Sequence, residues 1–420
     1  MMSDTILIAG AGPVGLTLAL SLHGQGKKVR VFEQVSEVRP LGVGINLLPH
    51  SVRVLHQMGL ESALDEVAIR TSALHYYNKY GQQIWTEPRG LAAGYQYPQY
   101  SIHRGEFQQL LLREVTARIG PETVVGNHAL TGWRDTSRGI EATFYDRESS
   151  REVKVAGASL IAADGINSTA RAILYPNEGA PIYGGRLLWR AVSRSEPFLD
   201  GHTMFMAGYQ DCKFVAYPIK QHADGTVLVN WIAELSVPVY QPEVQDWNKR
   251  VKVDAFSDSF NSWKFNWIDI PQLIAGCDQV FEFPLSDRDP KPQWTFGNMT
   301  LIGDAAHPMY PIGSNGASQG ILDAEKLCHE LCQSQPTHHA LLNYEAERRP
   351  ATAKIVLLNR QNGPEQVMQI AEERAPGGFQ NINEIIPRHE LEEIALRYKQ
   401  TAGFTIEAVN KELRKPSAGS

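Results

Sequence analysis

A glycine-rich turn near the N-terminus, Gly10-Ala11-Gly12-Pro13-Val14-Gly15, limits what this chain can fold into more than any other feature. It follows the apolar run 5–9, which is typical of a buried parallel strand, and it opens the helical pattern of residues 16–23. In such a turn, glycine permits a tight bend, close approach of the backbone to a pyrophosphate, and packing of the helix on the strand. The helix N-terminus then favours the phosphate charge.

A second strand, predicted at residues 29–33, completes a βαβ unit and ends in an acidic residue, Glu33. A carboxylate at this place can accept hydrogen bonds from both hydroxyls of an adenosine ribose. Strand, turn, helix and acid together predict a dinucleotide-binding unit, but they do not separate NAD from FAD. The alternative is a glycine-rich turn with only a structural role.

A second polar motif, Gly303-Asp304-Ala305-Ala306-His307-Pro308, follows a predicted strand at residues 299–302. It continues through a loop rich in Gly and Pro, residues 311–317, into a predicted helix near residues 317–332. Asp304 could bind a polyol hydroxyl, and the loop offers backbone N–H groups to a developing anion. On its own, the segment is equally well explained as an ordinary strand–loop–helix connection.

A third motif, Asp164-Gly165 with Ser168 and Arg171 after it, follows the apolar strand predicted at residues 159–162. Asp-Gly is also a common turn signal, so composition alone favours a plain turn here.

The length of the chain and its uneven distribution of tryptophan predict two structural units and a tail. A chain of 420 residues is too long for one ordinary core, and five of the eight tryptophans lie between residues 181 and 284. Runs there alternate like strands of a sheet with one covered face. We expect a mixed α/β (α+β) fold made of a Rossmann-like domain (1–180 and 285–360, with 71–100 on the substrate side), an inserted, mostly antiparallel β-sheet substrate domain (181–284) and a C-terminal helical segment (361–420).

Composition excludes several classes of protein. A net charge of −6 and a pI near 6.1 argue against nonspecific nucleic-acid binding, which needs a basic face. The uncharged stretch 6–22 is interrupted by glycines and no Lys or Arg precedes it, so we predict neither a signal peptide nor a membrane span, and a cytoplasmic protein. Cys328 and Cys332 lie one helical turn apart without a second ligand pair, which predicts reduced thiols and no metal site.

In this order and at these separations, the three motifs resemble the group A flavoprotein monooxygenases, which share the para-hydroxybenzoate hydroxylase fold. The family pattern is GxGxxG, an acidic residue, DG followed by Ser and Arg, and GDAAH with a Pro-rich loop. The resemblance spans about residues 5–350. Further runs, at residues 39–46, 87–90, 97–106 and 310–319, are similar to hydroxylases that act on phenazine carboxylates.

The resemblance implies that all three motifs bind FAD. Arg104 would reach the FAD phosphates or ribityl chain, unless it is only a solvated arginine at a helix start. Asp304 would hold the ribityl hydroxyls, and Asp164 would help bind both FAD and the nicotinamide. The residues implied for the cofactor are Gly10, Gly12, Val14, Gly15, Glu33, Gln34, Asn46, Arg104, Leu130, Asp164, Asp304, Gly313, Ser314, Asn315, Gly316 and Ala317.

The residues expected around the reacting ring come from the Pro-rich loop and from the inserted sheet. The resemblance places Pro311 near the oxygen-reacting carbon of the flavin, and the backbone of Gly313 and Asn315 is expected to stabilise flavin charge. In the sheet, the strands at 214–218 and 227–231 are expected to wall the site. Their side chains could equally be sheet packing. The candidates are Tyr217 (catalytic or substrate-binding), Asn230, Trp189 and Arg190 (substrate-binding).

The implied activity is hydroxylation of a small aromatic or heteroaromatic acid, with NADPH or NADH reducing FAD and O₂ giving a flavin C4a-hydroperoxide. The expected partner is this small substrate, and a homodimer is a candidate assembly. The competing enzyme class is an FAD-dependent NAD(P)H oxidase or reductase that transfers no oxygen to a substrate. A non-enzymatic carrier with the FAD fold is a third class, against which Asp304 and the Pro311 loop argue.

Overall fold

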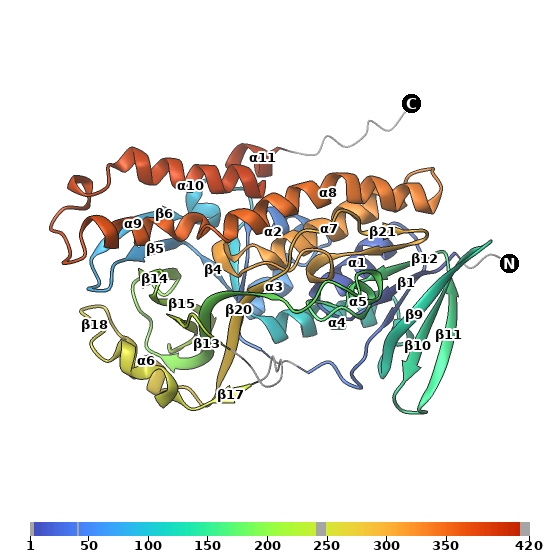
Figure 1. Ribbon diagram of the computed structural model, residues 1–420, viewed down its shortest axis with the longest axis horizontal. Coiled ribbons are helices and arrows are strands. Elements are labelled where there is room, and N and C mark those ends of the chain that lie inside the picture. The colour runs from blue at the N-terminus through green and yellow to red at the C-terminus, as the bar shows by residue number, and fades with distance from the viewer. Residues whose placement is uncertain (1–3, 40–41, 241–248, 412–420) are drawn as a thin grey trace.

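The computed structural model describes residues 4–39, 42–240 and 249–411, and two large sheets organise it (Figure 1). The first has six strands in the order β21-β22-β12-β1-β2-β8, parallel except for β21. The residues of β1 and β12 are all buried, as expected for strands covered on both faces of a parallel sheet. The strands are β1 (Ile6–Ala9), β2 (Val29–Phe32), β8 (Val124–Val125), β12 (Ser159–Ala162), β21 (Thr295–Phe296) and β22 (Met299–Leu301).

Helices and a three-stranded antiparallel meander complete this first domain. Helix α1 packs against α4 and α7, and α7 packs in turn against α2 and α8. The meander β11-β10-β9 lies at one end of the molecule in Figure 1, and its middle strand contacts β12. The elements are α1 (Pro13–Gly24), α2 (Pro49–Gln57), α3 (Glu61–Val67), α4 (Arg104–Arg118), η2 (Pro121–Thr123), β9 (His128–Thr136), β10 (Gly139–Asp146), β11 (Arg151–Gly157), α5 (Thr169–Leu174), α7 (Gly316–Leu331) and α8 (Thr337–Asn359).

The second large sheet has eight strands in the order β17-β20-β13-β16-β15-β14-β5-β6 and is antiparallel except between β14 and β5. One face packs on an aromatic cluster that includes Phe256, Phe260 and Trp263, and the other faces Ile312 and α9. Its elements are β5 (Ala73–Tyr77), β6 (Gln83–Pro88), β13 (Ile182–Ser195), β14 (Thr203–Tyr209), β15 (Cys212–Gln221), β16 (Val227–Ser236), β17 (Arg250–Val251), η3 (Val253–Ala255), η4 (Ser257–Phe260), β18 (Lys264–Phe265), β19 (Ile268–Asp269), α6 (Ile270–Ala275) and β20 (Val280–Asp287).

A small sheet, β3-β7-β4, and the C-terminal helices join the two domains. Strand β7 leads directly into α4 and also contacts β15. In Figure 1 the C-terminal helices α9 and α10, in red, run along the second sheet and α8. These elements are β3 (Gly44–Leu47), β4 (Ala68–Thr71), η1 (Gly90–Ala93), β7 (Gln99–His103), η5 (Gly303–Ala305), η6 (Ile312–Ser314), η7 (Gly363–Glu365), α9 (Gln366–Arg374), η8 (Ile382–Glu384), α10 (Arg388–Ala402) and α11 (Ile406–Asn410).

The mixed α/β fold and the strand–turn–helix unit at the N-terminus are confirmed. The strands predicted at 29–33, 159–162 and 299–302 and the helix predicted near 317–332 are present within two residues of their expected ends. The end of the expected C-terminal helical segment, residues 412–420, lies outside the described residues. Within the described ranges, no helix is long and apolar enough to cross a membrane.

Candidate active site

Consecutive strands of the first sheet bring the motif residues to one edge. Strands β2, β1, β12 and β22 are neighbours and parallel, so their carboxyl ends lie together. In the spatial order of the strands, these ends are followed by Glu33, Gly10, Asp164 and Asp304. Ligands of open α/β sheets bind at this edge. The three motifs, which are far apart in sequence, therefore form one site.

The glycines of the first turn have distinct tasks. Gly10 has φ +108°, and a Cβ there would lie 2.3 Å from the carbonyl oxygen of Ala163. A Cβ on Gly15 would lie 2.1 Å from the carbonyl oxygen of Gly10, so helix α1 packs directly on the turn. A Cβ on Gly12 would meet no atom within 4 Å. The backbone at Gly12 thus borders open space at a helix N-terminus, where a pyrophosphate fits.

Glu33 lies beside this turn. Its carboxylate accepts hydrogen bonds from the backbone N–H of Ala11 at 2.8 Å and of Val35 at 3.1 Å. The neighbouring Gln34 is exposed. Leu130 lies on β9, opposite Phe144, whose ring stacks on Phe32 at the end of β2. Glu33, Gln34 and Leu130 therefore surround the carboxyl end of β2, where an adenosine would lie.

Asp304 and Arg104 face the same space further along the edge. The Asp304 side chain is exposed, yet burial in the protein raises its pKa, although the positive charges of His307 and Arg104 oppose this rise. Among the described residues, none donates a hydrogen bond to its carboxylate. Both facts are explained if the carboxylate faces an open space inside the protein. Such a carboxylate fits the hydroxyls of a ribityl chain.

Asp164 follows strand β12 and lies between Gly10 and Asp304 along this edge of the sheet. Its Oδ2 accepts a hydrogen bond from the backbone N–H of Ala170 at 3.1 Å, whereas Oδ1 is buried without a partner. Burial raises the pKa of this carboxyl. An unpartnered buried acceptor beside Gly10 fits a polar ligand at this place.

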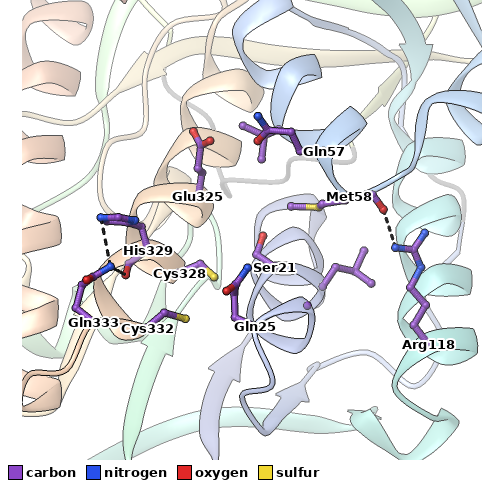
Figure 2. Close-up of a pocket in the computed structure, with 13 residues that line it drawn as sticks. Ser21, Gln25, Gln57, Met58, Arg118, Glu325, Cys328, His329, Cys332 and Gln333 are labelled. Carbon is purple, nitrogen blue, oxygen red and sulfur yellow. Dashed lines mark hydrogen bonds between the residues drawn. The ribbon is translucent and has the colours of Figure 1, made fainter. Parts of the chain in front are cut away.

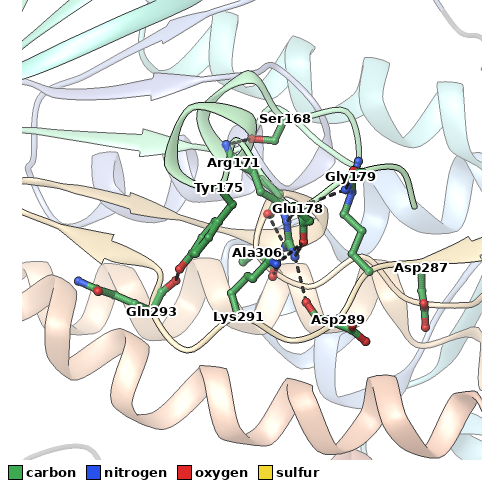
Figure 3. Close-up of polar contacts among 12 residues, drawn as sticks. Ser168, Arg171, Tyr175, Glu178, Gly179, Asp287, Asp289, Lys291, Gln293 and Ala306 are labelled. Carbon is green, nitrogen blue, oxygen red and sulfur yellow. Dashed lines mark hydrogen bonds and ion pairs between the residues drawn. The ribbon is translucent and has the colours of Figure 1, made fainter. Parts of the chain in front are cut away.

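The Asp304 loop is fixed from behind by a buried arginine (Figure 3). Arg171, 2% exposed, donates to the carbonyl oxygens of Ala305 at 3.1 Å and Ala306 at 2.8 Å. It also forms a bidentate ion pair with Glu178, with distances of 2.8 and 2.7 Å. The Arg of the third motif therefore positions the second motif.

His307 holds the same loop from the other side. Its Nε2 lies 2.5 Å from Oδ2 of Asp323, which also accepts from the backbone N–H of Gly303 at 3.1 Å. Arg348 donates to the second oxygen of Asp323 at 2.7 Å. Both His307 and Asp323 are buried. This network stabilises the loop.

The Pro-rich loop ends at the first turn of α7. Gly313 has φ +69°, and a Cβ there would lie 2.0 Å from the Tyr398 hydroxyl, so only glycine fits. Its N–H points to Oε1 of Glu365 at 3.4 Å. The first turn of α7, which begins at Gly316, has backbone N–H groups without helical partners and carries the positive end of the helix dipole. This turn can stabilise negative charge on a flavin ring.

Asn315 and Asn46 support this loop through their side chains. Asn315 is fully buried, and its Oδ1 accepts from Nε2 of Gln319 at 3.2 Å. Its side chain therefore turns into the protein, and its backbone is the part available to a cofactor. Asn46 donates from Nδ2 to Oγ of Ser314 at 3.4 Å and accepts from Oγ of Ser101 at 2.7 Å.

The structure brings three of the candidates in the inserted sheet together at Gly44. Oδ1 of Asn230 accepts the Gly44 N–H at 2.6 Å, and Nη2 of Arg190 donates to the Gly44 carbonyl oxygen at 3.0 Å. The Tyr217 hydroxyl interacts with Arg190 and Asn230, and burial raises the pKa of this phenol to about 12. Tyr217 is therefore protonated at neutral pH.

Trp189 is not part of this group. Its ring belongs to the aromatic cluster on the opposite face of the sheet, stacked on Phe256 with centroids 4.9 Å apart. Its Nε1 donates to Glu282 at 3.1 Å. Adjacent residues of a strand point to opposite faces, so Trp189 and Arg190 cannot both reach the flavin edge. This placement argues against a substrate contact for Trp189.

A small cavity borders the Pro-rich loop at Gly313 and Ser314. It is nearly closed in this structure, with a volume of about 10 Å³, roughly the room that one water molecule needs. Three polar residues that the sequence analysis does not select also line it: Tyr76, Arg89 and Gln99. The remaining lining is apolar and consists of Leu48, Leu74, Met204, Met206 and Pro364. Two runs within the resemblance to phenazine carboxylate hydroxylases give a signal for this group: the run 87–90 includes Arg89, and the run 97–106 includes Gln99.

A wider hollow between α1, α2 and α7 is separate from this site (Figure 2). Figure 2 shows Cys328 and Cys332 on its wall, and both thiols are free. Along α7, Cys328 lies 12 residues beyond Gly316, or about 18 Å from the loop at the helix N-terminus. The described residues include no cluster of side chains that could hold a metal ion.

Comparisons with known proteins identify the family of the chain. The model of the FAD binding domain family matches residues 3–358. The chain is 42% identical to phenazine 1,6-dicarboxylic acid hydroxylase PhzS of Lysobacter antibioticus over 363 residues, 84% of this chain and 89% of that protein. It is 30% identical to 3-amino-4-hydroxybenzoate 2-monooxygenase PtmB3 of Streptomyces platensis, covering 86% of this chain and 88% of that protein.

The fold is also that of a solved hydroxylase. A salicylate hydroxylase–substrate complex superimposes with a TM-score of 0.74 and 20% sequence identity, covering 97% of each chain. The resemblance to group A flavoprotein monooxygenases is thus confirmed. The chain belongs to the FAD binding domain family and is a flavin-dependent aromatic hydroxylase.

Proposed function

We propose that this enzyme hydroxylates a small heteroaromatic acid of the phenazine carboxylate type. The observation that carries the proposal is the cavity between Gly313–Ser314 and the second sheet, which combines apolar walls with a few polar groups. Similarity to the phenazine 1,6-dicarboxylic acid hydroxylase supports the choice of substrate class.

The residues at the sheet edge fit FAD. The open space at Gly12, the unpartnered oxygen of Asp164 and the accessible carboxylate of Asp304 are where a pyrophosphate and a ribityl chain would bind. Bound FAD supplies the two-electron chemistry that couples NAD(P)H oxidation to O₂ activation. One oxygen atom of O₂ enters the ring as a hydroxyl, and the other leaves as water.

The chain's own contribution is to orient the ring, exclude water and stabilise charge. The first turn of α7 offers N–H groups and a positive dipole end beside Gly313. The sheet strands β14 and β5 cover the cavity with Met204 and Leu74. Tyr217, protonated because of its raised pKa, can donate a hydrogen bond but cannot act as a base near neutral pH.

The test is turnover of the FAD-loaded enzyme with a panel of aromatic acids that includes phenazine-1-carboxylate and salicylate. We expect one class to accelerate NADH or NADPH oxidation while peroxide remains well below the nicotinamide consumed, and a hydroxylated product to form. Oxidation that no acid accelerates, with all reducing equivalents recovered as peroxide, would contradict the proposal and favour an oxidase.

Three further features stay predictions. The same assay compares NADH with NADPH. Light scattering of the purified enzyme would test the homodimer, and fractionation of the producing cells would test the cytoplasmic location.

A further inference from the structure

The polar lining of the cavity forms a group whose hydrogen-bonding capacity is not used within the protein. The Tyr76 hydroxyl, Nε of Arg89 and Oε1 of Gln99 are all buried and have no partner among the described residues. Tyr76 is 1% and Gln99 2% exposed. Buried polar atoms without partners are rare in folded proteins, so three around one cavity point to a ligand.

Positive side chains outnumber negative ones beside the cavity. Nη2 of Arg89 lies 3.1 Å from Oε2 of Glu87, and Nζ of Lys399 on α10 lies 2.6 Å from the other oxygen of Glu87. Although burial opposes ionisation, Arg89 and Lys399 hold the pKa of Glu87 below its usual range. Two cations therefore share one carboxylate. The excess positive charge, partly buried, favours an anion in the cavity.

The neighbouring charge cluster does not supply that anion. Glu365, the next acidic residue toward the flavin loop, accepts from Lys213 in a buried cluster that also contains Glu234 and Arg186. Two cations and two anions balance there. Glu365 is thus already engaged, and the excess charge at Arg89 remains.

We propose that Arg89 and Tyr76 bind the carboxylate of the aromatic substrate, and that Gln99 binds a neighbouring polar group on its ring. Nε of Arg89 supplies a charge-assisted donor and the Tyr76 hydroxyl a second donor. Burial raises the pKa of Tyr76, which keeps this phenol protonated. The inference deepens the proposed function and rests on it: it assigns the acid specificity to named side chains.

The position of this group fits ring orientation. Gly313 and Ser314 border the same cavity, so a carboxylate held by Arg89 directs the ring of the acid toward the flavin loop. Met204 and Met206 form part of the wall, and their flexible side chains can adjust to rings of different width. The carboxylate therefore sets the orientation, and the apolar wall tolerates variation in the ring.

The test compares an acid with its uncharged amide in the FAD-loaded enzyme. Binding of phenazine-1-carboxylate and phenazine-1-carboxamide is measured by titration calorimetry with the oxidised enzyme, and KM and kcat are measured in turnover. In Arg89→Gln we expect the Kd and KM of the acid to rise roughly 10- to 100-fold, with little change for the amide. In Tyr76→Phe we expect a rise of about 5-fold for the acid.

The variants and controls separate binding from folding. Lys399 still pairs with Glu87 in Arg89→Gln, so FAD content and melting temperature should stay near the wild-type values. Arg53→Gln is the matched control, because Arg53 forms a similarly shielded pair with Glu325 at 2.7 Å but does not line the cavity. Arg89→Lys, which keeps the charge, should recover part of the preference for the acid.

The outcomes distinguish the two proposals. If acids bind and are hydroxylated but Arg89→Gln keeps the wild-type preference for acid over amide, the assignment of Arg89 is wrong and the proposed function stands. A loss of affinity for acid and amide alike, or an equal loss in Arg53→Gln, also overturns the assignment. If no acid binds or is hydroxylated by the wild-type enzyme, both proposals fail.

Discussion

Replacement of Arg171 by methionine should destabilise the loop that carries Asp304, because the hydrogen bonds of Arg171 hold this loop in place. Arg171 donates to the carbonyl oxygens of Ala305, Ala306 and Asp289, at 3.1, 2.8 and 3.0 Å. Losing these three bonds and the two to Glu178 costs about 1 kcal/mol each, while Glu178 keeps Arg288 and Lys291 as partners. We expect a total loss of about 3–5 kcal/mol, which is large against a typical stability of about 5–15 kcal/mol.

A matched control lies in the same cluster. Arg288 donates to Glu178 at 3.1 Å and to the Gly179 carbonyl oxygen at 2.9 Å, but it makes no contact with the loop at Ala305. Glu178 keeps Lys291 in either variant. Arg288→Met should therefore cost about 1–2 kcal/mol and leave FAD content unchanged.

Urea denaturation followed by tryptophan fluorescence measures the stability, and absorbance of the purified protein measures bound FAD. Arg171→Met should unfold at lower urea and purify with less FAD than Arg288→Met. The reasoning is refuted if both variants lose the same stability, or if Arg171→Met binds FAD like the wild type.

Three other substitutions test the site. Asp304→Ala should purify with less FAD because the ribityl contact is lost; unchanged flavin content would contradict that role. Gly313→Ala should lose about 2–4 kcal/mol and most activity, because its Cβ would lie 2.0 Å from the Tyr398 hydroxyl; a wild-type melting temperature would argue against this. Burial lowers the pKa of His50 to about 3, so below pH 6.5 the unfolded chain takes up a proton at His50 that the folded protein does not. The free energy of unfolding therefore falls by about 1.4 kcal/mol per pH unit below pH 6.5. In His50→Gln, the urea midpoint should change less between about pH 6 and 4 than in the wild type.

The cofactor edge could be predicted from sequence because its information is local. Gly10, Gly12 and Glu33 stand at fixed positions after short apolar strands, and parallel strands bring their carboxyl ends together. The position of each of these residues follows from the strand that precedes it, so it can be predicted without knowing which distant segments are in contact. The backbone role of Gly313 similarly follows from the motif that contains it.

The substrate side could not be predicted in the same way. In β13, Trp189 and Arg190 point to opposite faces, and alternation does not say which face meets the flavin. The cavity joins segments around residues 48, 74–99, 204–206, 313 and 364. Its electrostatics depend on Lys399, which a helix brings back from the end of the chain. Helix α8 also lacks a clear sequence signal, since Pro350 lies inside it.

The interrupted first sheet has a consequence for synthesis of the chain. Strand β12 ends at Ala162, and its neighbour β22 begins at Met299, after the whole inserted sheet. At typical ribosomal rates β22 emerges on the order of ten seconds after β12. Until then one edge of β12 has no partner, and an open edge is a template for aggregation. Folding yield in the cell should therefore depend on how well that edge is protected while the inserted domain is being made.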